Sequence, residues 1–117
     1  MKKARIVLSE DASCAYSEIN RLASSSKQYA SLLKSVNNKV ALIKDNPHYG
    51  SPIAKSLIPR VYEKQFGVTN LFRVELSNFW RMEYTLKNHE SEIEIIAFVL
   101  DIVDHSKYNE LLGYKKN

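Results

Sequence analysis

Two segments in the first half of the chain carry apolar residues at the three- and four-residue spacing of amphipathic helices. The first follows the β-branched run of residues 4–8, which predicts a strand, and Ser9 or Asp11 can cap the helix that begins there. The second covers residues 27–44 and ends before Pro47, because proline cannot continue the hydrogen-bond ladder of a helix. We therefore expect a strand followed by a hairpin of two helices.

Farther along the chain the period of the pattern changes to two, which is typical of strands with one buried face. Even positions are apolar in residues 71–77 and again in residues 80–87, whereas the odd positions are polar in residues 73–77 and in residues 81–87. A three-residue turn at residues 77–79 keeps polar positions opposite polar ones, whereas a two-residue turn would pair polar with apolar positions. The pattern therefore predicts an antiparallel hairpin with a three-residue turn.

The end of the chain predicts one more strand and one more helix. Residues 92–103 include a run that is apolar on both faces, the pattern of a central strand covered on both sides. Residues 104–112 predict a short final helix that Gly113 ends. The whole order indicates an α+β fold, with a helical hairpin packed on a mostly antiparallel four-stranded sheet and a short C-terminal helix.

The segment between the helices and the hairpin holds all three prolines of the chain, at positions 47, 52 and 59. We expect an extended connection there, which Gly67 closes. Three basic residues lie along it among apolar ones: Lys55, Arg60 and Lys64.

Composition agrees with one soluble domain of residues 1–117, because a chain of this length can build a single core and 44% of it is apolar. The longest apolar stretch is interrupted by charges, and the apolar part of the amino-terminal segment is too short for a signal peptide. We therefore expect a cytoplasmic protein without a membrane span. The single cysteine, Cys14, excludes an internal disulfide and a multi-cysteine zinc site, and we expect it to be buried.

Charge is distributed unevenly along the chain. The net charge is +4 in residues 1–46, +3 in residues 47–87 and −3 in residues 88–117. Two basic segments suit an anionic partner such as nucleic acid. A soluble protein with a mild basic excess accounts for the same charge equally well.

Two arginines stand on the polar face of the predicted hairpin. The three-residue turn pairs Arg73 with Glu83, and it pairs Glu75 with Arg81. Such pairs can be cross-strand ion pairs on a solvated face, each contributing roughly 0.2–1 kcal/mol. Alternatively, the two guanidinium groups can hold a phosphate, because their planar fork matches its oxygen atoms. The spacing leaves both interpretations open.

His105 follows the predicted central strand and opens the last helix. The end of such a strand is a rigid position, and imidazole is the usual general acid or base near neutral pH. A hydrogen bond at the helix start, with Asp104 as its partner, is the alternative. The set of Asp101, Asp104 and His105 matches no metal signature, so we expect neither a metal nor another cofactor.

The hairpin and the carboxy-terminal part resemble a known family. Residues 70–86 read NLFRVELSNFWRMEYTL, and residues 95–114 read IIAFVLDIVDHSKYNELLGY. Together with the helical hairpin upstream, they are similar to the RelE/ParE superfamily of small toxins from toxin–antitoxin modules, over nearly the whole chain. The resemblance implies an α+β domain whose sheet carries a basic concave face.

The resemblance also implies an activity. RelE-like members cleave messenger RNA in the ribosomal decoding site, and ParE-like members inhibit DNA gyrase instead. In the nuclease branch the ribose 2′-hydroxyl attacks the adjacent phosphate, with a general base, a general acid and cations but no metal. A metal-independent mRNA endoribonuclease is thus the favoured function, and a ParE-like gyrase inhibitor or a catalytically inactive RelE-like binding protein is the alternative.

Carried over by position, Arg81 clamps the scissile phosphate, Arg73 lies near a second basic position, and His105 matches a late histidine used in acid–base work. Tyr108 corresponds to a late aromatic residue that touches the substrate. Glu75 departs from the lysine pair that RelE carries on this strand, and it either weakens substrate binding or acts as the general base. Further RNA-binding charge is expected from three residues of the connection: Lys55, Arg60 and Lys64.

A toxin of this kind is held silent by an antitoxin, so the resemblance implies a hetero-complex with a small acidic protein. A basic face attracts an acidic, partly disordered chain that folds on binding. We expect this partner to contact an apolar rim beside the basic residues, formed by Ile53, Leu57 and Ile58.

Overall fold

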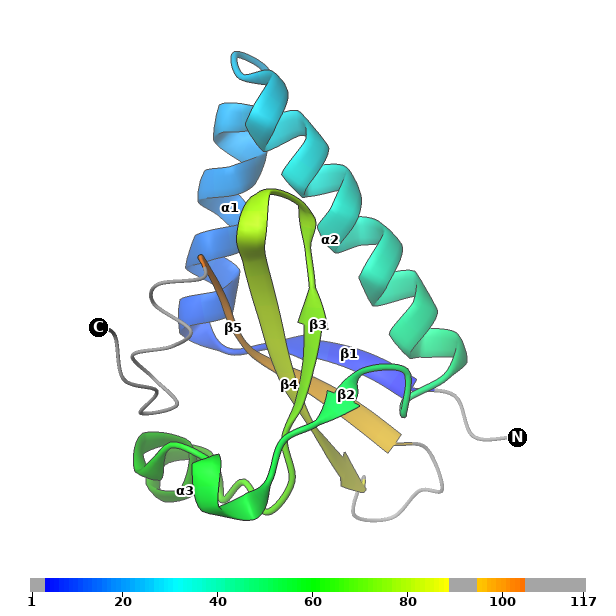
Figure 1. Ribbon diagram of the computed structural model, residues 1–117, viewed down its shortest axis with the longest axis vertical. Helices are drawn as coiled ribbons and strands as arrows, with labels where there is room; N and C mark the ends of the chain where they lie inside the picture. Colours follow the sequence, from blue (N-terminus) through cyan, green and yellow to red (C-terminus); the bar gives the residue numbers. More distant parts are fainter. Residues whose placement is uncertain (1–3, 89–94, 105–117) are drawn as a thin grey trace.

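The computed structural model describes residues 4–88 and 95–104. In this part of the chain a helical hairpin lies against a mostly antiparallel sheet, as the sequence pattern predicts (Figure 1). None of the helices in these two ranges has an apolar stretch long enough to cross a membrane. The predicted final helix lies beyond residue 104, outside the described residues.

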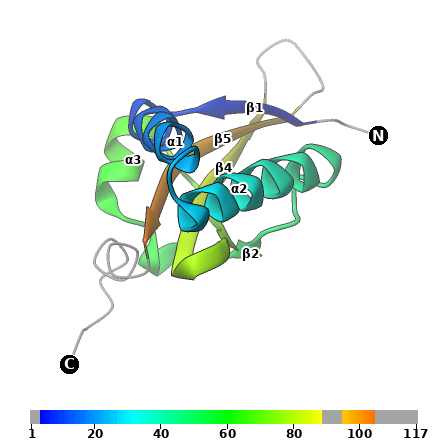
Figure 2. The ribbon, with the colours of Figure 1, turned by 90° about the horizontal axis from the view of Figure 1, so that it is seen from above.

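The helical hairpin consists of α1 (Glu10–Ala23) and α2 (Lys27–Asp45), which pack side by side (Figure 2). Each helix begins after a serine whose hydroxyl accepts a backbone N–H of the first turn, which satisfies one of the free donors at a helix start. Ser9 Oγ accepts from the Ala12 N–H at 3.0 Å, and Ser26 caps α2 in the same way. Of the two caps predicted for the first helix, Ser9 is therefore the one used.

Within the described ranges the sheet has five strands in the order β1-β5-β4-β3-β2. They are β1 (Ala4–Leu8), β2 (Ser51–Pro52), β3 (Phe72–Glu75), β4 (Trp80–Asn88) and β5 (Ile95–Asp104). β5 lies between β1, which runs parallel to it, and β4, which runs antiparallel. The predicted count of four strands is one short, because the two residues of β2 are too few to show a periodic pattern.

The register of the β3–β4 hairpin is the one that the alternation of polar residues predicts. Glu75 pairs with Arg81 across a turn at residues 77–79. Asn78 and Phe79 have φ angles of 58° and 65°, so both adopt the left-handed conformation. Asparagine tolerates this conformation, whereas a bulky residue rarely adopts it. The turn therefore stores some strain at an aromatic residue.

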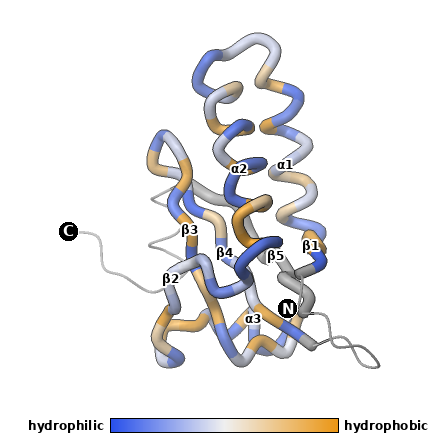
Figure 3. Tube along the Cα trace, turned by 90° about the vertical axis from the view of Figure 1, so that its right-hand side faces the viewer, coloured by the Kyte–Doolittle hydropathy of each residue, from blue (hydrophilic) through white to orange (hydrophobic). Residues whose placement is uncertain are grey.

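The main core lies between the helical hairpin and one face of the sheet. Even-numbered residues of the β3–β4 hairpin, such as Val74, Met82 and Tyr84, form the sheet side of it. The buried helix residues that meet them are Ala12, Ile19, Leu32, Val36 and Ile43. Apolar and polar residues alternate along both helices, so each buries one side (Figure 3).

Cys14 is exposed, so the expectation that it is buried was wrong. Ala12 and Ile19 define the buried side of α1. At 100° per residue Cys14 lies about 200° from Ala12, which turns it to the outer side of the helix. Its neighbour Ala15 is half-buried and marks the border of the apolar stripe.

Residues 60–66 form the helix α3 (Arg60–Phe66), whereas the prolines predict an extended connection throughout. Pro59 directly precedes this helix, where its fixed φ favours a helix start, and Gly67 ends it with a φ of 64°. Tyr62 and Phe66, four residues apart, pack on a second apolar cluster. That cluster includes Ile58, Val68 and Leu71. In Figure 1, α3 lies at the end of the β3–β4 hairpin that is remote from its turn.

Candidate functional site

Four odd-numbered residues of β3 and β4 form the candidate site. Because side chains alternate along a strand, they lie on the face of the sheet opposite to the main core. Arg73 pairs with Glu83, and Glu75 pairs with Arg81, as predicted. Each arginine therefore has a glutamate as its direct cross-strand neighbour, with about 4.5–5.5 Å between Cβ atoms. We name these four residues the charged face.

Burial differs across the charged face. Glu83 is fully buried, Arg73 and Arg81 are half-buried, and Glu75 is exposed. A buried carboxyl group needs hydrogen-bond or charge partners to remain stable. Glu83 has such a partner in α3, because the Tyr62 hydroxyl donates to Glu83 Oε1 at 2.9 Å. One carboxyl group is thus held inside the protein, and the other faces solvent, where a substrate can reach it.

The helix α3 covers one end of this face of the sheet. The Tyr62 hydroxyl donates to Glu83 of the charged face. Lys87, four residues farther along β4, donates from Nζ to the Phe66 carbonyl oxygen. Because Glu83 belongs to the face opposite to the main core, α3 and the helical hairpin lie on opposite sides of the sheet. The helix therefore shields Glu83 from water and leaves Glu75, near the turn, accessible.

The three cations predicted to bind RNA lie on or just before α3, and all are exposed. They are Lys55 on the short 3₁₀ helix η1 (Lys55–Leu57), and Arg60 and Lys64 on α3. Arg60 and Lys64 are four residues apart, so they share one side of the helix. Tyr62 is two residues from each of them, which places it about 200° away around the helix axis. Its side chain is buried, so it lies on the side of α3 opposite to the two cations. The structure therefore does not bring Arg60 and Lys64 together with the arginines of the charged face.

The three residues predicted to form an apolar rim for a partner are less exposed than that role requires. Ile58 is buried in the second apolar cluster, so it is not available to a partner, and Ile53 and Leu57 are half-buried. Val61, which the sequence does not single out, is 49% exposed beside Arg60 and Tyr62. An apolar contact on this side of the molecule would involve Val61 in place of Ile58.

His105 and Tyr108 lie outside the described residues. β5 ends at Asp104, whose backbone pairs with Trp80, and Val103 pairs with Arg81. The described chain therefore stops on the strand next to Arg81, one residue before His105.

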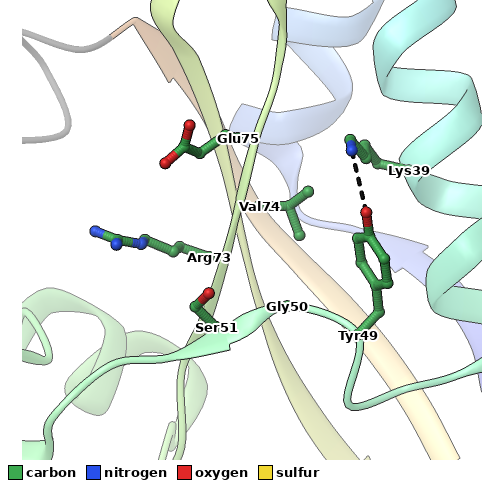
Figure 4. Close-up of a pocket in the computed structure, with 7 residues that line it drawn as sticks. All are labelled: Lys39, Tyr49, Gly50, Ser51, Arg73, Val74 and Glu75. Carbon is green, nitrogen blue, oxygen red and sulfur yellow. Dashed lines mark hydrogen bonds between the residues drawn. The ribbon is translucent and has the colours of Figure 1, made fainter.

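A pocket of about 340 Å³ lies at the edge of β3. Its lining comes from α2, the loop before β2, β2 itself and β3: Lys39, Tyr49, Gly50, Ser51, Arg73, Val74 and Glu75. β2 pairs with β3 only at Phe72 and Arg73, so no described strand covers the edge of β3 at Glu75. Figure 4 shows Arg73 and Glu75 on one side of β3, with Lys39 and Tyr49 on the other side. The pocket therefore extends around the edge of the strand from the charged face.

The loop that carries Tyr49 is fixed to the sheet by Tyr84. The Tyr84 hydroxyl accepts the Gly50 N–H at 2.9 Å and donates to the Pro47 carbonyl oxygen at 2.8 Å. Burial raises the pKa of the Tyr84 phenol above its ordinary value, and the hydrogen bond from Gly50 opposes this shift in part. A Cβ on Gly50 would lie 2.9 Å from the Arg73 carbonyl oxygen, so this close approach requires glycine.

Within residues 4–88 and 95–104, no three His, Cys, Asp or Glu side chains lie close enough together to hold a metal ion. Comparisons with family models, with curated proteins and with solved structures find no match for this chain.

Two features of the site are not evident in the sequence. The first is the buried hydrogen bond between Tyr62 and Glu83, which depends on the presence of α3. The four-residue spacing of Tyr62 and Phe66 is the signal in the sequence that indicates this helix. The second is the contact of Lys39 with Tyr49, where Lys39 Nζ donates to the Tyr49 hydroxyl at 3.1 Å. No sequence signal predicts this contact, since the position of the loop depends on Tyr84, 35 residues later.

Proposed function

We propose that this chain is the toxin of a toxin–antitoxin module and cleaves messenger RNA on the ribosome, as RelE-like proteins do. The observation that carries the proposal is the charged face, where Arg73 and Arg81 stand on the same side of neighbouring strands. Two guanidinium groups in this arrangement suit the oxygens of a phosphodiester. The resemblance to the RelE/ParE superfamily leads to the same assignment, with a RelE/ParE-like sheet and a final helix after β5.

In the proposed reaction the ribose 2′-hydroxyl attacks the adjacent phosphorus. The 2′-oxygen–phosphorus bond forms and the phosphorus–5′-oxygen bond breaks, which leaves a 2′,3′-cyclic phosphate and a 5′-hydroxyl. A base takes the proton of the 2′-hydroxyl, and an acid gives one to the leaving 5′-oxygen. Glu75 is exposed and is the proposed base, and His105 is the proposed acid. Arg81 and Arg73 stabilise the charge that develops on the phosphate.

The remaining predicted residues have supporting roles in this proposal. Tyr108 touches the substrate, and the separate cationic surface on α3 and η1 contacts the backbone of the RNA: Lys55, Arg60 and Lys64. Charged surface groups of this kind act mainly on association and lose strength as salt rises. In the cell of origin a small acidic antitoxin holds the toxin silent in a hetero-complex. Co-expression with the neighbouring reading frame and pull-down at low and high salt tests this partner.

Induced expression with mapping of transcript ends tests the proposed activity. Arg81→Ala is expected to lower the cleavage rate by roughly 10²–10³-fold and to relieve growth arrest, because it removes charge stabilisation from the transition state. Arg21→Ala is the matched control, because Arg21 is an exposed arginine on α1 that bonds to Glu18, away from the charged face. The control is expected to cleave transcripts and arrest growth like the unchanged protein.

Two other results would contradict the nuclease proposal. Intact transcripts together with altered DNA supercoiling would identify a gyrase inhibitor. Intact transcripts with unchanged supercoiling and normal growth would identify a binding protein without catalytic activity.

A further inference from the structure

The pocket at the edge of β3 is polar, and it is continuous with the charged face. Its volume of about 340 Å³ is similar to that of small ligand sites. The lining holds two cations and one carboxylate, from Lys39, Arg73 and Glu75. Ser51 adds a hydroxyl group, and Tyr49 adds an aromatic ring. Arg73 belongs to both the pocket and the charged face. A polymer bound on the charged face therefore reaches the pocket by passing the edge of β3 (Figure 4).

Tyr49 is positioned as a stacking surface. Tyr49 lines the pocket and is still 39% exposed. The Lys39 ammonium group lies 3.1 Å from the Tyr49 hydroxyl and 5.4 Å from the ring centroid, so it occupies the hydroxyl end of the ring. The neighbouring Gly50 is held by the Tyr84 hydroxyl, which restrains the loop before any ligand binds. A restrained aromatic ring beside a cation is the usual element of single-strand binding sites.

We propose that this pocket binds one nucleotide of a single-stranded RNA, adjacent to the phosphate held on the charged face. The base stacks on Tyr49, the Lys39 ammonium group contacts the flanking phosphate, and Ser51 donates to the sugar or base. This subsite rests on the proposed function, because the RNA that enters it is the strand bound by Arg73 and Arg81. An acidic peptide would use the cations equally well, but it would give no role to the exposed ring of Tyr49.

The test measures binding separately from cleavage. A short end-labelled RNA with 2′-O-methyl groups lacks the attacking hydroxyl, so its fluorescence anisotropy reports affinity alone. Tyr49→Ala is expected to weaken binding roughly 5- to 100-fold, because one stacking contact is lost. Tyr49→Phe keeps the ring, and its affinity is expected to stay within about threefold of the unchanged protein.

Lys39→Gln tests the phosphate contact. It is expected to reduce the slope of log affinity against log salt by about one, because one phosphate contact is lost. Lys44→Gln is the matched control, because Lys44 is exposed on the same helix and does not line the pocket. The control is expected to leave the slope nearly unchanged. Equal effects of the two variants would show a general effect of charge and overturn the subsite.

A titration with uridine monophosphate distinguishes failure of the subsite from failure of the proposed function. The amide resonances of Gly50 and Ser51 are expected to shift in the unchanged protein and to stay in place in Tyr49→Ala. If transcripts are cleaved but Tyr49→Ala binds RNA and the nucleotide like the unchanged protein, the subsite is wrong and the nuclease stands. If transcripts stay intact but the nucleotide shifts these resonances in a Tyr49-dependent way, the pocket binds nucleotides and the nuclease is wrong. Binding of an acidic peptide in place of both probes overturns the subsite.

Discussion

Tyr84 connects the loop before β2 with the sheet through one hydroxyl group. That hydroxyl accepts the Gly50 N–H and donates to the Pro47 carbonyl oxygen, while the ring stacks on Phe72 with 5.3 Å between centroids. The side chain is fully buried, so neither bond is exchanged with water in the folded state. The position of the proposed nucleotide pocket therefore depends on a residue that does not line it.

Tyr84→Phe is expected to lower the free energy of unfolding by about 1–3 kcal/mol at neutral pH, because the buried Gly50 N–H and the half-buried Pro47 carbonyl oxygen lose their partner. The difference from the unchanged protein should shrink above pH 10. Burial raises the pKa of Tyr84 in the folded state, so its stabilisation is complete below the ordinary tyrosine value of about 10 and declines as pH rises through the folded value. Urea unfolding at neutral and at alkaline pH measures the difference, and a constant difference would contradict this account.

Some of the candidate site could be predicted residue by residue. The pairing of Glu75 with Arg81 was confirmed, because alternation with one buried face allows a single register. The burial of Glu83 could not be derived in the same way, since α3 causes it and α3 itself was not expected. The alternation of polar and apolar residues along a strand predicts on which face of the sheet a side chain lies. It does not predict which other element covers that face.

At the scale of elements, α3 shows why the segment around the prolines was misread. Proline excludes the middle of a helix but suits the position before one, and Pro59 stands in front of α3. The helix has few residues, so the pair Tyr62 and Phe66 is the only apolar spacing in it that indicates a buried helix side. A short helix of this kind is stabilised by its tertiary contacts more than by its own sequence.

Tyr62→Phe is expected to lower the free energy of unfolding by about 1–3 kcal/mol, because the buried Glu83 carboxyl group loses a hydrogen bond from α3. Tyr16→Phe is the matched control. The Tyr16 hydroxyl donates to Asn37 Oδ1 at 2.8 Å on the exposed side of the helical hairpin, where water can replace it. Its removal is expected to cost less than about 0.5 kcal/mol. Equal losses in urea unfolding would show that the bond from α3 has no special weight.

The turn of the β3–β4 hairpin is attached to α2. The Ser77 N–H donates to Ser35 Oγ at 3.2 Å, and Asn78 Nδ2 donates to the Gln28 carbonyl oxygen at 3.3 Å. The side chain of Phe79, in contrast, is 76% exposed, and its backbone has a φ of 65°. The conformation of the turn is therefore imposed by the hairpin register and by α2, against the preference of Phe79.

Phe79→Asn is expected to keep the free energy of unfolding or to raise it by up to about 1 kcal/mol, because asparagine tolerates the left-handed conformation. Phe79→Ala removes the same ring without this tolerance, so it should be the less stable of the two variants. Thermal unfolding of both variants measures the order. A loss of more than about 1 kcal/mol in Phe79→Asn would show that the exposed ring stabilises the fold.

At the scale of the whole molecule, the sheet separates two apolar clusters. The helical hairpin covers one face and α3 covers part of the other, so the charged face lies beside a helix on its own side of the sheet. The sequence indicates one basic face, but the cations of α3 point away from Arg73 and Arg81. Net charge along a chain predicts the sign of a partner and not the surface on which that partner binds.

The parallel pairing of β1 with β5 has a consequence for synthesis of the protein. Ala4 pairs with Ile95, so β1 is made long before the strand with which it pairs. At about 5–20 residues per second, the chain between them takes roughly 5 to 20 seconds to make. During that time the helical hairpin has been translated, but β1 and β4 both lack β5, their shared neighbour in the described sheet. A chain arrested before β5 therefore contains every residue of the charged face without the strand that pairs with β4 in the finished sheet.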